Sequence, residues 1–343
     1  MNPYIQDILA QPDTLAATLQ QLPQAVTDLR SLAARLKAGA FSRIVLTGMG
    51  SSLAALYPFW FRLVQAGYAP IIIETSELLY DAANLITVDT LLVIVSQSGR
   101  SAEIVRLIEQ RGGATVLAVT NDATSPLAQT AEVVVLTAAG VESNVSCKTY
   151  VCSLAALVLV SDTLVAQNPL EPPSFEQLQA VGEVMTAYLN RWQEYATSLG
   201  DLLGGGSSLI ICGRGPSLAA VHYSALILKE AAKVHTEGLT APQFRHGPME
   251  LAKTSVQVLV YEGQGSTVPL NRRLVADVIE AGGRAYLIGN TDQPEAFHLP
   301  AASPAALPIL EILPMQLLSV GLAWRNGLEP GQFYIGSKIT TVE

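Results

Sequence analysis

The chain has 343 residues, of which half are hydrophobic and 14% are charged, and its formal net charge is −9. This composition excludes extensive disorder, because so many apolar residues can build a substantial core. It also argues against a nucleic-acid-binding protein, which needs clustered Lys and Arg residues that this sequence lacks. The length predicts roughly one to three domains.

The N-terminal segment, residues 1–40, shows helical periodicity broken by polar loops and predicts roughly two or three helices. It has no basic region followed by an apolar stretch, so it does not predict a secretory signal. The cysteines Cys147, Cys152 and Cys212 are odd in number and lack metal-site spacing. They predict buried free thiols in a reducing compartment. We therefore expect a soluble cytoplasmic protein that does not enter a membrane.

From residue 41 onward, short apolar runs alternate with helical patterns. Near-continuous apolar strands that alternate with helices are typical of parallel sheets covered on both faces. The fold class is therefore predicted as α/β. The first sheet is expected to contain five strands, at "RIVLTGMG", "APIIIETSE", "DTLLVIVSQSG", "ATVLAVTND" and "AEVVVLTA".

The sequence also contains a long-range internal match. "GMGSSLAA" at 48–55 resembles "GRGPSLAA" at 213–220, an offset of 165 residues. A repeat of this length is typical of two copies of one domain rather than of a solenoid. We expect two five-stranded α/β domains, the first over residues 41–167 and the second over residues 207–330. A linker with a connecting helix would join them over residues 168–206, and a C-terminal tail would follow over residues 331–343. The best linker sequence is "NPLEPPS" at 168–174.

The loop after the third strand carries a cluster of hydroxyl and amide side chains, and its counterpart in the second copy, "YEGQGST", does not keep this hydroxyl cluster. Ligands of open parallel sheets bind beyond the carboxyl ends of the strands, and the first N–H groups of the next helix favour an anion. The loop therefore predicts a phosphate-ester site. The alternative is that Ser98 or Ser101 only caps the helix. The residues concerned are Ser96, Gln97, Ser98, Gly99 and Ser101.

A second polar corner, at Gly50, Ser51 and Ser52, ends the first strand and could face the same crevice. "GMGSSL", together with Glu74 at the end of the next strand, also imitates a dinucleotide site. The third glycine of that motif is missing, which argues against nucleotide binding.

A different chemical cluster lies in "LKEAAKVHTEGLTAPQFRHGPMEL", residues 228–251. Glu230 has mostly apolar helical neighbours, and partial burial would raise the pKa of its carboxyl toward that of a useful base. His246 stands in the turn-like "RHGP". The alternative is that Glu230 pairs with Lys229 or Lys233 at the surface and that His246 is an ordinary loop residue. The histidines lack metal-ligand spacing, so no metal is expected.

Several motifs taken together resemble one known family: "GMGSS", "SQSGRSAEI", "CGRGPSLAA", "LKEAAKVHTEG", "FRHGP" and "SKITTVE". In this combination and order, over roughly residues 40 to 343, the chain resembles the double sugar-isomerase (SIS) domain family. It is similar to the isomerase half of glutamine–fructose-6-phosphate aminotransferase. The resemblance implies two tandem SIS domains and a homodimer with shared active sites.

The resemblance also implies site residues. The polar loop would hold the phosphate of a sugar, and the Gly50–Ser52 corner would add contacts. Glu230 would move a proton between C1 and C2, His246 would assist ring opening, often from the partner subunit, and Lys338 could form an imine with the open-chain ketose. Val145 and Ser337 would add contacts to the sugar.

The chain departs from this pattern in places. No glutaminase domain precedes residue 40, so glutamine-dependent amination is not expected, and Arg100 replaces a commonly acidic residue. We expect a phosphosugar isomerase acting on a ketose or aminosugar 6-phosphate, with or without release of ammonia or an amine. No cofactor is needed, because enolisation requires a base, an acid and an oriented carbonyl.

Two other functions stay open. The first is a fructosamine-6-phosphate deglycase. The second, of another class, is a non-catalytic phosphosugar-binding regulator. The joint presence of Glu230, His246 and Lys338 favours an enzyme, because a sensor would need only the phosphate loop.

Overall fold

The computed structural model describes residues 1–165, 174–205, 208–292 and 294–340. The chain forms two compact units, each named here by its sheet, and neither is continuous in sequence. The five-stranded unit comprises Ala10–Glu142, Lys148–Gly182 and Gly336–Glu343, and the four-stranded unit comprises Met1–Leu9, Ser143–Cys147 and Glu183–Ile335. The expected linker at 168–174 lies, except for its last residue, outside the described residues.

The sheet of the five-stranded unit is parallel throughout, in the order β2-β1-β3-β4-β5. Its central strands are buried along their whole length because they are apolar on both faces. The predicted α/β class and parallel sheet are confirmed. The strands are β1 (Arg43–Gly48), β2 (Ile71–Glu74), β3 (Thr90–Val95), β4 (Thr115–Thr120) and β5 (Val133–Leu136).

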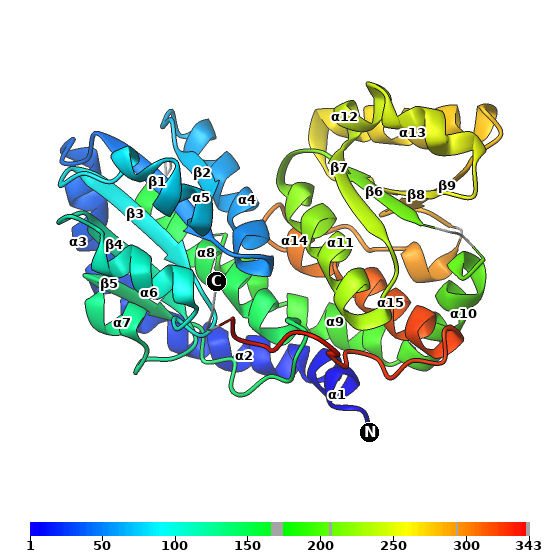
Figure 1. Cartoon of the computed structure of the whole chain (residues 1–343), viewed down its shortest axis with the longest axis horizontal. Helices are drawn as coiled ribbons and strands as arrows, with labels where there is room; N and C mark the ends of the chain where they lie inside the picture. Colours follow the sequence, from blue (N-terminus) through cyan, green and yellow to red (C-terminus); the bar gives the residue numbers. More distant parts are fainter. Residues whose placement is uncertain (166–173, 206–207, 293, 341–343) are drawn as a thin grey trace. The chain divides into compact units, whose positions relative to one another are not determined.

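Helices cover both faces of this sheet (Figure 1). On one face α5, α6 and α7 bury apolar side chains against the strands. On the other face α4 and α8 pack together, and α2 and α3 pack against α8. The bounds are α2 (Gln11–Gln21), α3 (Val26–Lys37), α4 (Ser51–Gln65), α5 (Thr75–Tyr80), α6 (Ala102–Glu109), α7 (Pro126–Thr130) and α8 (Lys148–Val165).

The second sheet is also parallel, in the order β7-β6-β8-β9. Its strands are β6 (Leu209–Gly213), β7 (Thr236–Thr240), β8 (Gln257–Tyr261) and β9 (Arg284–Ile288). The expectation of a fifth strand is wrong within the described residues, where one bridge, Gly289 to His298, follows β9. Pro294, Pro300 and Pro304 in this segment cannot donate to a strand ladder, which explains the difference.

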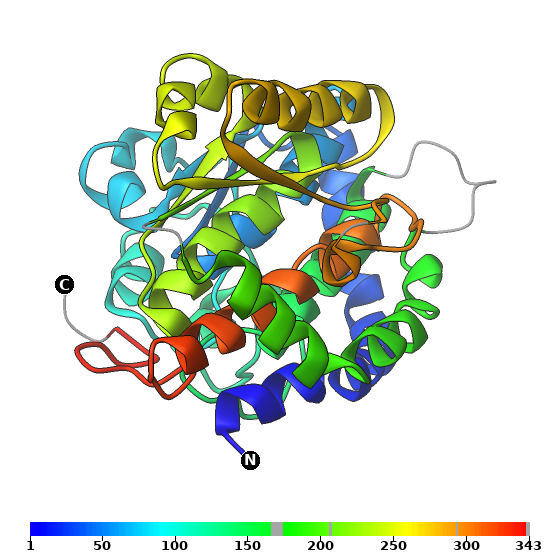
Figure 2. The same ribbon diagram turned by 90° about the vertical axis from the view of Figure 1, so that its right-hand side faces the viewer.

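The helices of the four-stranded unit again form two layers. Figure 2 shows α13 lying across one face of the sheet, where α12 also packs. The opposite face is covered by α11, which packs on α15, and α15 packs on α10. The bounds are α1 (Pro3–Leu9), α9 (Val181–Leu189), α10 (Trp192–Leu203), α11 (Leu218–Ala232), α12 (Ala241–Arg245), α13 (Val268–Glu280), α14 (Leu307–Leu310) and α15 (Leu313–Arg325).

Two helical stretches are long and apolar enough to cross a membrane, Lys148–Val165 and Leu307–Arg325. In the structure, 78% of the first and 89% of the second are buried. Their hydropathy is therefore accounted for by packing inside the core.

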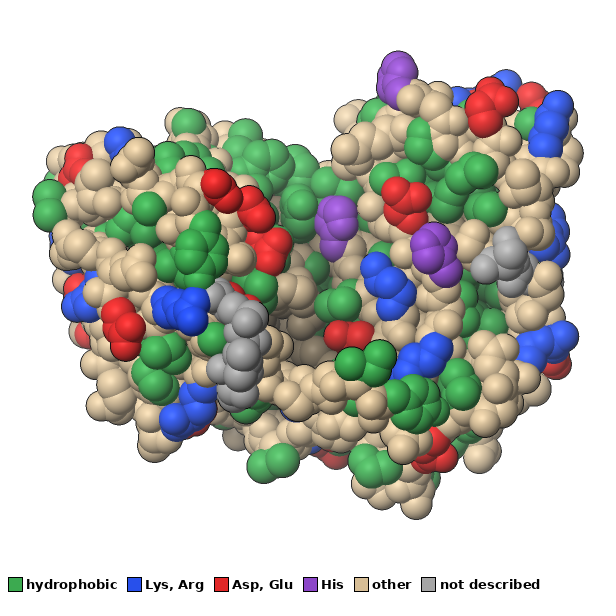
Figure 3. Space-filling model, in the orientation of Figure 1, with side chains coloured by type: hydrophobic (Ala, Val, Ile, Leu, Met, Phe, Trp, Pro, Cys, Tyr) green, Lys and Arg blue, Asp and Glu red, His purple; other side chains and the backbone are tan. Residues whose placement is uncertain are grey.

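Charged side chains are spread over the face shown in Figure 3, where Lys and Arg do not gather into one patch. A basic surface large enough to bind a nucleic-acid backbone is therefore not seen on this face. Cys147, Cys152 and Cys212 are buried free thiols, as the sequence predicts. Burial raises the pKa of Cys152 and of Cys212 to about 12, so these thiols stay protonated at neutral pH.

One carboxyl group lies deep inside the four-stranded unit. Glu311, just after α14, is 1% exposed, and its Oε1 accepts a hydrogen bond of 2.6 Å from the Ser217 hydroxyl. Within the part of the chain that the structure describes, its Oε2 has no hydrogen-bond partner. Burial raises the pKa of Glu311 to about 8, and the Ser217 hydrogen bond only partly opposes this shift.

This raised pKa predicts a pH-dependent stability. Between an unfolded pKa of about 4.5 and the folded value of about 8, unfolding ionises Glu311, so stability falls as pH rises. The free energy of unfolding should decline by roughly a few kcal/mol over this interval, and Glu311→Gln should remove that decline. Urea unfolding at pH 5 to 8 measures both. The control is Glu280→Gln, which changes an exposed side chain of α13. Parallel pH profiles for the wild type and Glu311→Gln would contradict the assignment.

Candidate active site

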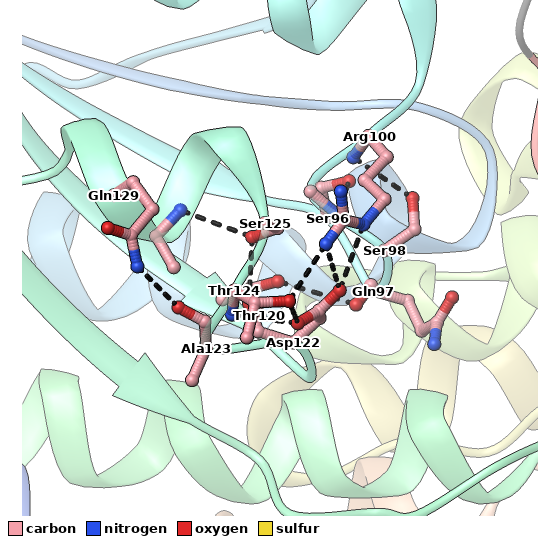
Figure 4. Close-up of polar contacts among 12 residues, drawn as sticks. Ser96, Gln97, Ser98, Arg100, Thr120, Asp122, Ala123, Thr124, Ser125 and Gln129 are labelled. Carbon is pink, nitrogen blue, oxygen red and sulfur yellow. Dashed lines mark hydrogen bonds and ion pairs between the residues drawn. The ribbon is translucent and has the colours of Figure 1, made fainter.

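The polar loop at residues 96–101 lies between β3 and α6 and folds around its own hydroxyl groups (Figure 4). The backbone N–H of Gly99 donates to Ser96 Oγ at 3.1 Å, and that of Arg100 donates to Ser98 Oγ at 3.2 Å. The Ser96 N–H donates to Val119 O at 3.0 Å, which fixes the start of the loop to β4. The loop is thus a defined structure at the carboxyl end of the sheet.

Gly99 is the residue that allows this fold of the loop. Its φ is +59°, and a Cβ at this position would lie 2.4 Å from Ser125 Oγ and 2.7 Å from Ser125 Cβ. Its carbonyl also accepts a hydrogen bond from the Leu127 N–H at 3.4 Å. Both the left-handed backbone of Gly99 and the close approach of Ser125, at the start of α7, therefore require glycine at this position.

The N-terminus of α6 does not use the loop's hydroxyl groups as caps. Ser101 is the N-cap residue, but its side chain makes no capping hydrogen bond, and Ser98 accepts from Arg100 instead. The alternative that either serine simply caps the helix is therefore not supported. The N–H of Ala102 donates at 3.1 Å to the carbonyl of Thr340, in the C-terminal segment.

Arg100 is neutralised locally. Its guanidinium donates to Asp122 Oδ2 from Nε at 2.9 Å and from Nη2 at 2.8 Å, and to Thr124 Oγ1 at 2.9 Å. Hydrogen bonds from Thr124 and from Arg100 lower the pKa of the Asp122 carboxyl. In Figure 4 this cluster lies beside the loop. The arginine therefore adds little net positive charge there.

The Gly50–Ser52 corner ends the neighbouring strand. In the register of the parallel pair, Gly48 of β1 stands opposite Val95 of β3, so both polar corners begin at the same edge of the sheet. Gly50 has φ 52° and ψ −122° and precedes α4, whose first residues are Ser51 and Ser52. The predicted proximity of the two corners follows from this register.

Lys338 belongs to the same unit as the polar loop. Its Nζ donates to Glu142 Oε2 at 2.6 Å. The Glu142 side chain is fully buried and that of Lys338 is 21% exposed. Thr149, in the first turn of α8, donates to this carboxylate from its N–H at 2.9 Å and from its hydroxyl at 2.5 Å. The N-terminus of α8 thus holds the buried carboxylate of Glu142, and that carboxylate in turn holds the lysine.

Sequence reasoning missed Glu142. A signal was available, because this carboxylate stands at a strand-to-helix corner, between β5 and the long apolar helix α8.

Two further residues, Ser337 and Val145, were predicted to contact the sugar. Ser337 is exposed, and its hydroxyl donates to Ile339 O at 2.8 Å. Val145 is buried and belongs to the four-stranded unit.

Glu230 lies half-buried in the last turn of α11, in the four-stranded unit. Lys233, the left-handed C-cap of this helix with φ 56°, donates from Nζ to the backbone carbonyl of Glu230 and to Gln332 O. These hydrogen bonds direct the ammonium to backbone carbonyl groups. The carboxyl of Glu230 stands close to the end of the helix.

His246 is exposed at the C-terminal end of α12, in the turn that Gly247 makes with φ 137°. The helices α11 and α12 cover opposite faces of the same sheet (Figure 1). Within this unit the fold therefore places His246 and Glu230 on elements of different layers. Over the described residues, no group of three His, Cys, Asp or Glu side chains is arranged to hold a metal ion.

Comparison with known proteins identifies the class of the five-stranded unit. Residues 41–161 match the SIS domain family, so the chain contains one SIS domain. A second SIS domain over residues 207–330 stays a prediction.

The chain is 28% identical to glutamine–fructose-6-phosphate aminotransferase [isomerizing] of Thermococcus kodakarensis, in an alignment that covers 97% of this chain and 58% of that protein. The chain thus spans a little over half the length of this relative.

Solved structures share the fold. The C-terminal domain of glucosamine-fructose-6-phosphate aminotransferase from Francisella tularensis has a TM-score of 0.85 at 21% identity, covering 97% of this chain and 98% of that one. Tagatose-6-phosphate ketose/aldose isomerase from Escherichia coli has a TM-score of 0.81 at 17% identity, covering 96% and 94%. At these identities the likeness concerns the fold alone.

The geometry around Gly99 predicts the effect of a single methyl group. Gly99→Ala should destabilise the protein by roughly 1–2 kcal/mol for the left-handed backbone and by about 1–3 kcal/mol more for the clash with Ser125. Gly112→Ala is a matched control, because Gly112 has φ 54° and its nearest atom would lie 3.9 Å from the new Cβ. Urea unfolding compares the two variants. Equal losses would show that the contact with Ser125 does not constrain the loop.

Proposed function

We propose that this chain is a phosphosugar isomerase that acts on a ketose or aminosugar 6-phosphate. The observation that carries the proposal is the polar loop at 96–101, which lies inside the matched SIS domain and keeps hydroxyl groups at the start of α6 without using them as caps. Relatives named as isomerases and isomerizing aminotransferases support the same class.

The phosphate would bind at the two polar corners of the five-stranded unit. Hydroxyl groups and backbone N–H groups would donate to the ester oxygens, and the dipole of α6 would favour the negative charge. A glycine at each corner lets the backbone approach the ligand. The residues in this role are Gly50, Ser51, Ser52, Ser96, Gln97, Ser98, Gly99 and Ser101.

The chemistry would be a proton transfer between C1 and C2 of the open-chain sugar. Glu230 would remove the proton from one carbon and return it to the other, and His246 would assist ring opening by moving a proton at the ring oxygen. Because these two residues lie on different layers of one unit, we propose that His246 serves the site of the partner subunit in a homodimer. The reaction itself needs no redox centre.

Lys338 would form an imine with the ketose carbonyl. Its Nζ must lose a proton before it attacks the carbon, and the amine and carbonyl then join with loss of water. Glu142, which already accepts a hydrogen bond from this Nζ, is placed to receive that proton. We propose Glu142 as a positioning residue for Lys338. Val145 and Ser337 would add contacts to the sugar.

With an aminosugar, the proton transfer would give an imine at C2 or C1, and water would hydrolyse it, leaving a carbonyl oxygen on the carbon and releasing ammonia or an amine. A fructosamine-6-phosphate deglycase would use the same groups. A non-catalytic phosphosugar-binding regulator is the competing function of another class. Glu230, His246 and Lys338 together favour the enzyme. We place this enzyme in the cytoplasm.

Glu230→Gln should lower turnover by about 100-fold or more, because the amide cannot accept the proton. Phosphosugar affinity should change little, since the substitution leaves the phosphate site intact. The measurement is deuterium incorporation at C1 or C2 of fructose 6-phosphate, glucosamine 6-phosphate and fructosyl-amino-acid 6-phosphates in heavy water.

Glu237→Gln, at an exposed position of β7, is the matched control and should exchange deuterium like the wild type. Deuterium exchange retained in Glu230→Gln would show that Glu230 is not the catalytic base. Binding by the wild type without any exchange would favour the regulator.

Ser101→Ala should weaken phosphosugar binding about tenfold without lowering stability, because its hydroxyl makes no cap. Ser125→Ala provides the contrast, since Ser125 Oγ accepts a hydrogen bond from the Ala128 N–H at 3.2 Å and caps α7. That variant should lose about 1 kcal/mol of stability. Calorimetric titration and urea unfolding measure the two effects. A stability loss in Ser101→Ala with unchanged affinity would restore the capping explanation.

A further inference from the structure

The four-stranded unit contains a cavity of about 710 Å³ beyond the carboxyl ends of β8 and β9. Glu262 and Gly263 follow β8 in its wall, and Gly289 and Asn290 follow β9. Ligands of open parallel sheets bind at this edge, and cavities of this size accommodate small molecules. None of the residues assigned above to the phosphosugar reaction lines this cavity.

The most unusual group in the wall is the carboxyl of Glu311. It is almost completely buried, and its Oε1 accepts the hydrogen bond from Ser217. Its Oε2 lacks a hydrogen-bond partner over the described part of the chain. A buried polar atom without a hydrogen bond is costly, so such an atom beside a cavity favours a ligand that supplies one. Burial raises the pKa of Glu311 to about 8, which favours the uncharged form of the group at neutral pH.

The charged side chains of the wall are already paired. Arg272 donates from Nε to Glu262 Oε1 at 2.7 Å, and the same carboxylate accepts a hydrogen bond from the Asn290 N–H at 2.6 Å. The guanidinium is therefore matched by one carboxylate. With Glu311 protonated, these side chains sum to no net charge, so the wall has no unpaired Lys or Arg side chain to attract an anion.

The rest of the wall combines apolar and polar surface. Apolar side chains come from α13, β9, the segment before α14 and α14 itself: Val268, Ile288, Leu299 and Leu307. Gln264 and His298 add a carboxamide and an imidazole. A wall with a few convergent hydrogen-bonding groups among apolar side chains suits a compact ligand with both C–H faces and hydroxyl groups.

The internal sequence match allows the residues of this cavity to be compared with those of the candidate phosphate site. At the offset of 165 residues, Ser217 matches Ser52, and the loop "YEGQGST" replaces "SQSGRSA". In the four-stranded unit, the serine hydroxyl donates to Glu311 and a carboxylate, Glu262, takes the place of Gln97. The two corners thus differ in that a carboxylate replaces the amide of Gln97 and the serine that matches Ser52 is bonded to a buried carboxyl group.

We propose that this cavity binds a small uncharged ligand rich in hydroxyl groups, of the class of free sugars and polyols. A ligand hydroxyl would pair with Glu311 Oε2, and the apolar wall would contact the C–H face of the ligand. The site is separate from the phosphosugar site and does not depend on the proposed reaction.

The test is calorimetric titration of the full chain at neutral pH with glucose, N-acetylglucosamine and glycerol as probes. At least one probe should bind once per chain. Glu311→Leu should weaken this binding by about tenfold or more, because it removes the hydrogen-bonding carboxyl, and Glu311→Gln should largely retain it. Ala301→Trp fills the cavity from an exposed position in its wall and should also abolish binding.

Several results would overturn the proposal. They are the absence of binding by all three probes and binding that Ala301→Trp leaves unchanged. Loss of binding in Ser98→Ala would also overturn it, because the sugar would then occupy the phosphate corner. Deuterium exchange with phosphosugars is independent of each of these outcomes, so failure of this proposal and failure of the proposed enzyme are distinguishable.

Discussion

The candidate phosphate site depends on the parallel register of β1 and β3. Gly48 stands opposite Val95, so both strands end at one edge and deliver their polar corners side by side. The strands approach closely, since a Cβ on Gly48 would lie 2.8 Å from the Val95 carbonyl oxygen. A shift of register by one residue would turn the side chains of one strand to the opposite face of the sheet and move the ends of the two strands apart. The apolar strands therefore fix where the serines lie, and the serines then define what can bind.

The same architecture carries different chemistry in the two units. In the five-stranded unit, the edge of the sheet presents hydroxyl groups, and the nearby carboxylate of Glu142 is fully engaged by Thr149 and Lys338. In the four-stranded unit, the corresponding edge presents Glu262, paired with Arg272, and the buried carboxyl of Glu311. We propose that the first arrangement binds an anion and the second an uncharged ligand, because desolvation and charge pairing decide which ligand is stabilised. On this proposal, one fold supports two binding chemistries through its loops.

The sequence predicted the strands of the first sheet well because each is an apolar run bounded by glycine or polar residues. The short helix α5 was missed, since Thr75–Tyr80 continues directly from the strand and has no separate start signal. The expected fifth strand of the second sheet is not found among the described residues, because the prolines after β9 cannot donate to a strand ladder. Glu142 was missed for a different reason. Its role depends on Lys338, which lies 196 residues later, and a contact of this range leaves no local pattern. For the same reason, sequence could propose Glu230 and His246 but could not place them on different layers of one unit.

The central claim is that the loop at residues 96–101 binds the phosphate of a sugar. The most direct measurement is a crystal structure of the protein soaked with fructose 6-phosphate. The account predicts phosphate oxygens within hydrogen-bond distance of the hydroxyl groups of Ser96, Ser98 or Ser101, with the Gly50–Ser52 corner alongside. A phosphate bound elsewhere, for example in the cavity next to Glu311, would contradict it.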